Sequence, residues 1–157
     1  MSYLSTNYTT VCLLTKAPMT ATPSNVPVVP NGRQLALRVM TMPKDTNQYG
    51  TIFGGVMLSI IDQAGFAEAR RHGRHRWVTV AIDRVEFKQP VQLGDIVECW
   101  TSVERLGRTS VTLNVDVLAQ RYDSGLTVQV TTARLTMVSV DASGVAIPHA
   151  APPTVGV

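Results

Sequence analysis

One long helical pattern stands among segments that otherwise alternate like β-strands, and this contrast constrains the fold most. The pattern covers residues 54 to about 72 and is stopped by Gly73. One strand-like run precedes it at 35–40, and four runs follow it, at 77–88, 96–106, 109–121 and 127–140. The tight "LGRTS" break predicts an antiparallel hairpin. Because one helix and one antiparallel sheet can bury their apolar faces only against each other, this order predicts an α+β domain with a curved sheet around a central helix.

The two ends of the chain differ from this central unit in composition. Residues 1–32 are rich in Thr, Ser, Asn, Pro and Ala, with repeated Pro and no period, which predicts a flexible N-terminal leader. The final segment, 143–157, contains "AIPHAAPPTVGV" and is predicted to be a flexible tail. The folded domain is therefore expected to span 33–142.

The composition is that of one globular domain and excludes several classes of protein. The chain has 157 residues, of which 45% are hydrophobic and 16% charged, and a net charge of +3. Cys12 and Cys99 have neither metal-type spacing nor the pattern of a disulfide framework. No apolar run reaches membrane-spanning length, no signal peptide is evident and no basic tract is typical of nucleic-acid binding. We expect a cytoplasmic protein without membrane or nucleic-acid partners.

Asp62 lies within the helical pattern among apolar and small residues. On a helical wheel, one side carries Val56, Met57, Ile60, Ile61, Ala64 and Ala67, which are expected to face the sheet. Asp62 falls on the other side, whose neighbours are Gly55, Leu58, Gly65, Phe66 and Ala69. A helix that is apolar on both sides is buried on both sides, so we expect a second copy of this helix across a two-fold axis. Gly65 and Ala69 would let that neighbour approach closely.

A carboxylate in such an interface costs stability unless it is paired or hydrated, and acids of this kind often have a chemical role. The alternative is that Asp62 lies at a solvent-exposed edge of the helix and has no functional role. The start of the helix carries Gly54 and Gly55, where free backbone N–H groups could meet an oxyanion. Packing alone can also require glycine there, and Asn47 can serve ordinary turn chemistry.

Geometry separates these candidate groups within one chain. Gly55 and Asp62 are seven positions apart along the helix, or roughly 10 Å. One chain cannot easily direct both at one reacting atom, whereas two antiparallel helices across a dimer axis could. This expectation agrees with the interface inferred from the helical wheel.

Three segments in order resemble one known family: "MPKDTNQYGTIFGGVMLSIIDQAG", "VTVAIDRVEFKQPVQLGDIVECW" and "GRTSVTLNVDV". They are similar to the YciA-type acyl-CoA thioesterases of the hotdog-fold superfamily, from about Leu35 to Val140. The resemblance implies a hotdog fold, with an antiparallel five-stranded sheet wrapped around one long central helix. It also implies a homodimer as the catalytic unit, with the active site at the dimer interface, and often a hexamer built as a trimer of dimers.

The resemblance implies roles for individual residues. Asp62 occupies the position of the family's catalytic acid, and Asn47 that of the "DTN" asparagine contributed by the partner chain. The backbone amides of Gly54 or Gly55 would polarise the thioester carbonyl.

A CoA-binding segment is also implied, since "GRTS" matches the family's CoA-binding hairpin. Arg108, Thr109 and Ser110 would meet phosphate or pantetheine groups, and Thr79 and Lys88 are further candidates for the CoA groove. The sequence departs from the family at Val56, where a large residue such as Trp is frequent, and this change could reshape the acyl pocket. The segment "RRHGRHRW" is unusually basic; it is either a solvated turn or a contact for a CoA phosphate.

We therefore expect hydrolysis of acyl-CoA to a free carboxylic acid and CoA. Asp62 would act as general base on a water molecule, or as a nucleophile that forms an anhydride. No metal or other cofactor is expected, because CoA is part of the substrate and the histidines have no nearby acid or cysteine in sequence. A hotdog hydratase or dehydratase is disfavoured, because its chemistry usually needs a histidine paired with an acid, and His72, His75 and His149 lie neither in the loop nor in the first helical turns. A non-catalytic acyl-CoA sensor is the remaining alternative, which the presence of both Asp62 and Asn47 disfavours.

Overall fold

A computed structural model describes residues 32–156 of the chain, so the predicted leader falls almost wholly outside the described residues. The elements are β1 (Gln34–Met40), α1 (Gly54–Ala69), β2 (Arg76–Phe87), β3 (Ile96–Leu106), β4 (Ser110–Gln120) and β5 (Thr127–Val140), with 3-10 turns at Pro43–Asp45 and Arg70–His72. Each predicted strand is confirmed to within one residue at either end. The predicted helix is also confirmed, except that its last three residues form the second 3-10 turn.

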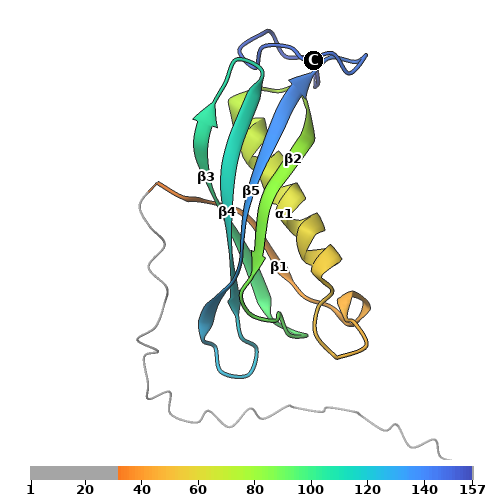
Figure 1. The fold of residues 1–157 in the computed structure, drawn as a ribbon, viewed down its shortest axis with the longest axis vertical. Helices are drawn as coiled ribbons and strands as arrows, with labels where there is room; N and C mark the ends of the chain where they lie inside the picture. Colours follow the sequence, from red (N-terminus) through yellow and green to blue (C-terminus); the bar gives the residue numbers. More distant parts are fainter. Residues whose placement is uncertain (1–31, 157) are drawn as a thin grey trace, which may run out of the picture.

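The five strands form one antiparallel sheet in the order β1-β3-β4-β5-β2, which leaves β1 and β2 at its two edges. The sheet curves around α1, which runs along its inner face (Figure 1). The core lies between them and consists of helix side chains such as Met57 and Ile61 and inward-facing strand residues such as Val115, Leu113 and Leu135. This arrangement confirms the predicted hotdog architecture. Burial in this core raises the pKa of the Cys99 thiol to about 12, so that the thiol stays protonated.

The side of the helix that faces the sheet differs from the wheel prediction. Gly65 and Ala69 were expected at an interface with a second helix, but both are buried against the chain's own sheet. A Cβ atom on Gly65 would overlap Cδ1 of Leu135, so the absence of a side chain serves close packing of helix on sheet. Ala67, expected in the buried stripe, is only half-buried. The buried stripe is therefore turned about the helix axis toward the side of Gly65.

A buried acid lies near the end of the helix. Glu68 is 4% exposed, accepts a hydrogen bond from Oγ1 of Thr101 at 2.7 Å and forms an ion pair with Arg71. Oγ1 of Thr101 also lies 3.2 Å from the carbonyl oxygen of Gln34, and Nη2 of Arg71 donates to the carbonyl of Leu35. Glu68 falls on the same side of the helical wheel as Met57, Ile61 and Ala64, and these partners satisfy its carboxylate inside the protein.

The C-terminal segment was expected to be a flexible tail, and the structure instead places residues 143–156 against the folded domain. Asp141 accepts hydrogen bonds from the backbone amides of Ser143 and Val145 and so closes a turn after β5. The chain then bridges back to Val140 at Ala146 and continues across the end of the molecule. Proline and alanine predict a lack of regular secondary structure, but a segment without such structure can still be held by hydrogen bonds from its backbone.

Candidate active site

Asp62 lies on the part of α1 that the sheet leaves open. Its side chain is half-buried, and its Oδ1 atom accepts a hydrogen bond from the hydroxyl of Thr79 on β2. The alternation of β2 turns Thr79 toward the helix, opposite Met137 of β5. Thr79 was predicted to lie in the CoA groove, and the structure assigns its hydroxyl to the candidate catalytic acid.

A cavity of about 660 Å³ opens at this pair. It is lined mainly by apolar side chains from the helix, both edges of the sheet and β5: Leu37, Phe66, Ala67, Trp77, Val78 and Met137, together with Asp62, Gln63 and Thr79. Phe66 is 44% exposed, which is unusual for a phenylalanine on a central helix. The site thus places one carboxylate at the wall of an apolar cavity, as binding of an acyl chain beside a general base would require.

The start of α1 lies about two helical turns from Asp62. Phe53 precedes the helix, and its carbonyl accepts hydrogen bonds from the amides of Val56 and Met57. Within residues 32–156, no acceptor is found for the amide N–H of Gly54 or Gly55. A Cβ atom on Gly54 would lie 3.5 Å from the ring of Phe87, while Gly55 faces open space. These two N–H groups are therefore available to a carbonyl oxygen or an oxyanion.

Asn47 lies in the loop before the helix and is held by that loop. Its Nδ2 donates to Oγ1 of Thr51 at 2.9 Å, and its Oδ1 accepts from the amides of Tyr49 and Thr51. This is the turn chemistry considered as an alternative for this residue. An amide nitrogen carries two hydrogens, so one N–H of Asn47 remains for a ligand after the bond to Thr51 is made.

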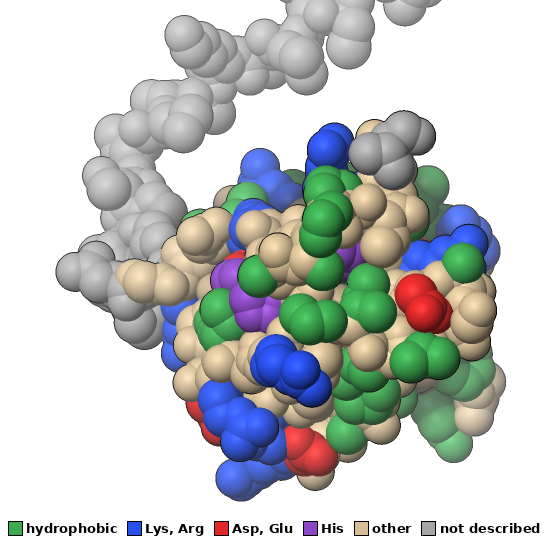
Figure 2. Space-filling view, turned by 90° about the horizontal axis from the view of Figure 1, so that it is seen from above, with side chains coloured by type: hydrophobic (Ala, Val, Ile, Leu, Met, Phe, Trp, Pro, Cys, Tyr) green, Lys and Arg blue, Asp and Glu red, His purple; other side chains and the backbone are tan. Residues whose placement is uncertain are grey.

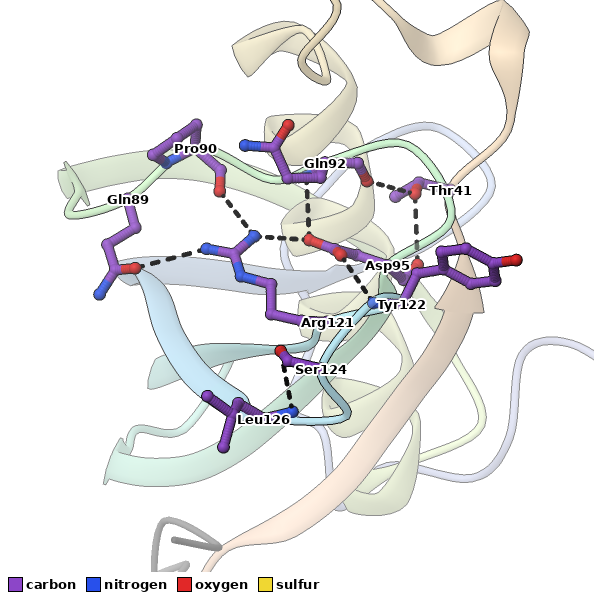
Figure 3. A network of polar contacts seen from close by, with 9 residues as sticks. All are labelled: Thr41, Gln89, Pro90, Gln92, Asp95, Arg121, Tyr122, Ser124 and Leu126. Atoms are coloured by element: carbon purple, nitrogen blue, oxygen red, sulfur yellow. Dashed lines mark hydrogen bonds and ion pairs between the residues drawn. The ribbon is translucent and has the colours of Figure 1, made fainter. Parts of the chain in front are cut away.

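A polar network fixes the segment 88–95, which lies beside the start of the helix (Figure 3). The Asp95 carboxylate is 1% exposed and pairs with Nη1 of Arg121 at 2.6 Å, while it accepts from the amides of Gln92 and Tyr122. Thr41 joins the network through the carbonyl oxygens of Gln92 and Asp95. The carbonyl of Val91 in this segment accepts from the amide of Ile52, so the network supports the helix start indirectly.

The predicted CoA-binding residues do not come together within one chain. Lys88 lies at the end of β2 near the helix start, where its Nζ donates to Oε1 of Gln129 at 2.9 Å. Arg108, Thr109 and Ser110 form the β3–β4 hairpin at the other end of the sheet (Figure 1). The hairpin is closed by a bond from the amide of Gly107 to the carbonyl of Ser110 and is joined to β5 through Thr109.

Sequence reasoning missed two contributors to the site. The role of Thr79 as the hydrogen-bond partner of Asp62 depends on the register between helix and strand. Phe87 closes over Gly54, and only its place at the end of an edge strand could have suggested this. Within the described residues, no group of three or more His, Cys, Asp or Glu side chains lies in a metal-binding arrangement.

Comparison with known proteins places this site in a family. The model of the Thioesterase superfamily matches residues 49–124. The acyl-CoA thioester hydrolase YciA of Escherichia coli is 38% identical over 119 residues, covering 74% of this chain and 89% of that protein. The chain belongs to the Thioesterase superfamily. The matched region contains Asp62, both helix-start glycines and the β3–β4 hairpin.

Solved structures of two proteins extend the comparison to the fold and the site. A hexameric broad-specificity acyl-coenzyme A thioesterase, crystallised as an aspartate-to-alanine mutant, superposes with a TM-score of 0.72 at 34% identity, over 78% of this chain and 90% of that one. An acyl-CoA hydrolase from Staphylococcus aureus is 25% identical, with TM-scores of 0.67 and 0.65 for two mutants, over 74% of this chain and 70–71% of that one. These mutants replace an asparagine and an aspartate whose spacing in sequence equals that between Asn47 and Asp62.

In the part of the chain that the structure describes, no helix has the length and apolar character needed to cross a membrane.

Proposed function

We propose that this protein hydrolyses acyl-CoA thioesters to free carboxylic acids and CoA. The observation that carries the proposal is the Asp62–Thr79 pair at the wall of an apolar cavity, on a helix face that the sheet leaves open. Family membership and the thioester hydrolases among the relatives support the same activity.

In the proposed reaction, Asp62 acts as general base. It accepts a proton from a water molecule, whose oxygen attacks the thioester carbonyl carbon. The oxyanion that forms accepts hydrogen bonds from the free amides of Gly54 or Gly55, a stabilisation on the order of 3 kcal/mol per donor. The C–S bond then breaks, the acid product leaves, and the sulfur of CoA takes a proton. Thr79 holds the Asp62 carboxylate in place through its hydroxyl, and an aspartyl anhydride remains the alternative route.

The site is completed by a second copy of the chain. Eight residues of helix, or roughly 12 Å, separate Gly54 from Asp62, so one chain cannot bring both to one carbonyl. The edge strand β2 exposes apolar side chains: Val78, which lines the cavity at Asp62, is 42% exposed, and Phe87, whose ring lies against Gly54, is 54% exposed. An exposed apolar edge strand is a surface for pairing with another strand. We therefore propose a homodimer in which Asp62 of one chain faces Asn47, Gly54 and Gly55 of its partner, with the hexamer as a further assembly.

The same dimer would bring the proposed CoA-binding residues of the two chains close together. In an antiparallel pair, the hairpin Arg108–Ser110 of one chain lies toward the helix start and Lys88 of its partner. The cavity at Asp62 is predominantly apolar, which favours an acyl chain over a charged acid. We also propose that the enzyme acts in the cytoplasm without a membrane or nucleic-acid partner.

The first test is hydrolysis of a panel of acyl-CoAs from acetyl to palmitoyl, including an aromatic one, followed by release of free thiol. We expect wild-type turnover, and a fall of about 10² to 10⁴ in kcat for Asp62→Ala, because the general base is lost. CoA binding should be retained in the variant, as measured by calorimetry. Normal turnover by Asp62→Ala would refute the assignment of the base. Failure of the wild type to hydrolyse any member while it still binds CoA would indicate a sensor.

A further inference from the structure

The C-terminal residues 146–155, which we call the strap, cross the end of the molecule where α1 finishes and the β3–β4 hairpin turns. Figure 2 views this end, where Lys and Arg side chains lie at several places around an apolar centre. The strap begins beside β5, where the amide of Ile147 donates to the carbonyl of Ser139 at 2.9 Å. Oγ of Ser139 lies 2.6 Å from the carbonyl of Ile147 and 3.1 Å from that of Thr109, so the start of the strap and the hairpin meet at one residue.

His75 anchors the strap from inside the protein. It is 1% exposed, and its Nε2 donates to the carbonyl of His149 at 3.0 Å. Its Nδ1 lies 3.1 Å from Oγ1 of Thr154, which donates to it when the ring is neutral. A Cβ atom on Gly73 would lie 2.5 Å from the His149 carbonyl oxygen, so only glycine lets the strap come this close. Both ring nitrogens of a buried histidine are thus used to hold a segment with no regular secondary structure.

The strap also holds the backbones of two arginines. The amides of Thr154 and Val155 donate to the carbonyl of Arg74 at 3.1 and 3.3 Å, and the amide of His149 donates to the carbonyl of Arg108 at 3.0 Å. Since His149 lies against Gly73 as well, one strap residue touches both the turn before β2 and the hairpin. The backbones of Arg74 and Arg108 are therefore held in place by the strap, and their side chains extend from these fixed positions.

The side chains of these two arginines differ from those of the arginines around Arg74. Arg71 is paired with Glu68, Arg70 donates to the carbonyl of His75, and Arg76 donates to the carbonyl of Ala142. Arg74 and Arg108 are exposed, and no hydrogen bond or ion pair of either guanidinium is found within residues 32–156. Two guanidinium groups on fixed backbones, with no internal acceptor, are suited to an anionic ligand, and guanidinium binds phosphate with particularly good geometry.

We propose that the strap holds Arg74 and Arg108 as one binding site for the phosphate groups of the CoA moiety, and that His75 and Thr154 position it. The inference rests on the proposed function, because CoA is the phosphate-bearing part of the substrate. It adds Arg74 to the hairpin residues that resemble the family's CoA-binding segment, and it gives the C-terminal segment a role. His75 and Thr154 act on substrate only through the strap and are positioning residues.

The decisive experiment compares two substrates that share an acyl group, acyl-CoA and acyl-pantetheine, which lacks the nucleotide and its phosphates. We expect Arg74→Gln and Arg108→Gln each to raise KM for acyl-CoA about tenfold, the loss of a charge-assisted hydrogen bond. Their kcat values, and both constants for acyl-pantetheine, should stay within twofold of wild type. Arg76→Gln is the matched control, because it removes the same charge at the same end of the molecule from a guanidinium already bonded within the chain.

The positioning role is tested with Thr154→Val, which removes one hydroxyl, and with the harsher His75→Ala. We expect Thr154→Val to raise KM for acyl-CoA several-fold while KM for acyl-pantetheine is unchanged. A merely structural role would change both substrates alike or lower only the unfolding midpoint. An equal loss on both substrates, or an unchanged KM for acyl-CoA in Arg74→Gln, would overturn the inference.

The test of the phosphate site can fail or succeed independently of the test of thioester hydrolysis. Binding of CoA and of pantetheine to the same variants is measured by calorimetry without turnover. If the wild type hydrolyses no acyl-CoA, the proposed function fails, but a roughly tenfold weaker affinity for CoA in Arg74→Gln, with no such change in Arg76→Gln, still supports the phosphate site. If the wild type hydrolyses acyl-CoA and Arg74→Gln binds CoA as tightly as wild type, only the phosphate site fails.

Discussion

Gly65 illustrates how one residue determines how closely the helix packs on the sheet. Glycine in a helix interior normally lowers helix stability by about 1 kcal/mol relative to alanine, so its presence needs a reason. Here the reason is Leu135, a fully buried side chain whose Cδ1 occupies the space that a Cβ on Gly65 would need. Close approach of helix and sheet at this point also sets the height at which Asp62 meets Thr79 on β2.

We predict that Gly65→Ala destabilises the protein by about 1 kcal/mol despite the better helix propensity of alanine. Overpacking against a buried leucine costs about 1–3 kcal/mol, which exceeds the propensity gain. Urea unfolding measures the difference, with Gly55→Ala as the control, since a Cβ at Gly55 meets open space. A Gly65→Ala protein more stable than the wild type would contradict this account of the packing.

At the scale of elements, the helix is fixed at its two ends by different devices. Its start is supported by the loop 88–95, which the buried Asp95–Arg121 pair holds in place. Its last turn is joined to β1 and β3 by Glu68, through Arg71 and Thr101. Asp62 lies along the helix between these two attachments, and its side chain lines the cavity on the open face.

We predict that Glu68→Ala lowers the free energy of unfolding by about 2 kcal/mol, because it leaves the buried hydroxyl of Thr101 with one partner fewer and Arg71 without its acid. Glu68→Gln should cost less, since the amide oxygen can still accept from Thr101. The Arg38–Glu98 pair supplies the control: Arg38→Ala should cost less than about 1 kcal/mol, because the Arg38 side chain is 53% exposed and Glu98 keeps its hydrogen bond from Nε1 of Trp100. Chemical denaturation distinguishes these cases; equal losses for Glu68→Ala and Arg38→Ala would show that the buried cluster has no special role.

At the scale of the whole molecule, the single chain presents an incomplete site. The helix has one face against the sheet and one face open, and the proposed catalytic groups are spread along it. A two-fold axis that pairs the open faces would produce two identical sites, each with residues from both chains.

Complementation tests whether the site is shared. Asp62→Ala and Asn47→Ala should each be nearly inactive alone. When the two are unfolded together and refolded as a mixture, half of the dimers contain one of each chain, and one of their two sites has both residues intact. We therefore expect about a quarter of wild-type activity. If both residues of a site came from the same chain, the mixture would stay as inactive as its components.

The sequence by itself determined the elements and their order, because hydrophobic periodicity and turn residues are local properties of the chain. One helix and five strands admit few arrangements, so the architecture followed as well. The motifs also singled out Asp62, Asn47 and the helix-start glycines, since each stands in a local pattern.

Only the tertiary structure decided which residues meet. The pairing of Asp62 with Thr79, the burial of Glu68 and the place of Gly65 all depend on how the helix is turned about its axis relative to the sheet. That rotation is set by close packing and by hydrogen bonds between distant residues, which apolar periodicity does not encode. The ordered strap has the same origin, because a segment without regular structure is held by partners, His75 among them, that lie far away in the sequence.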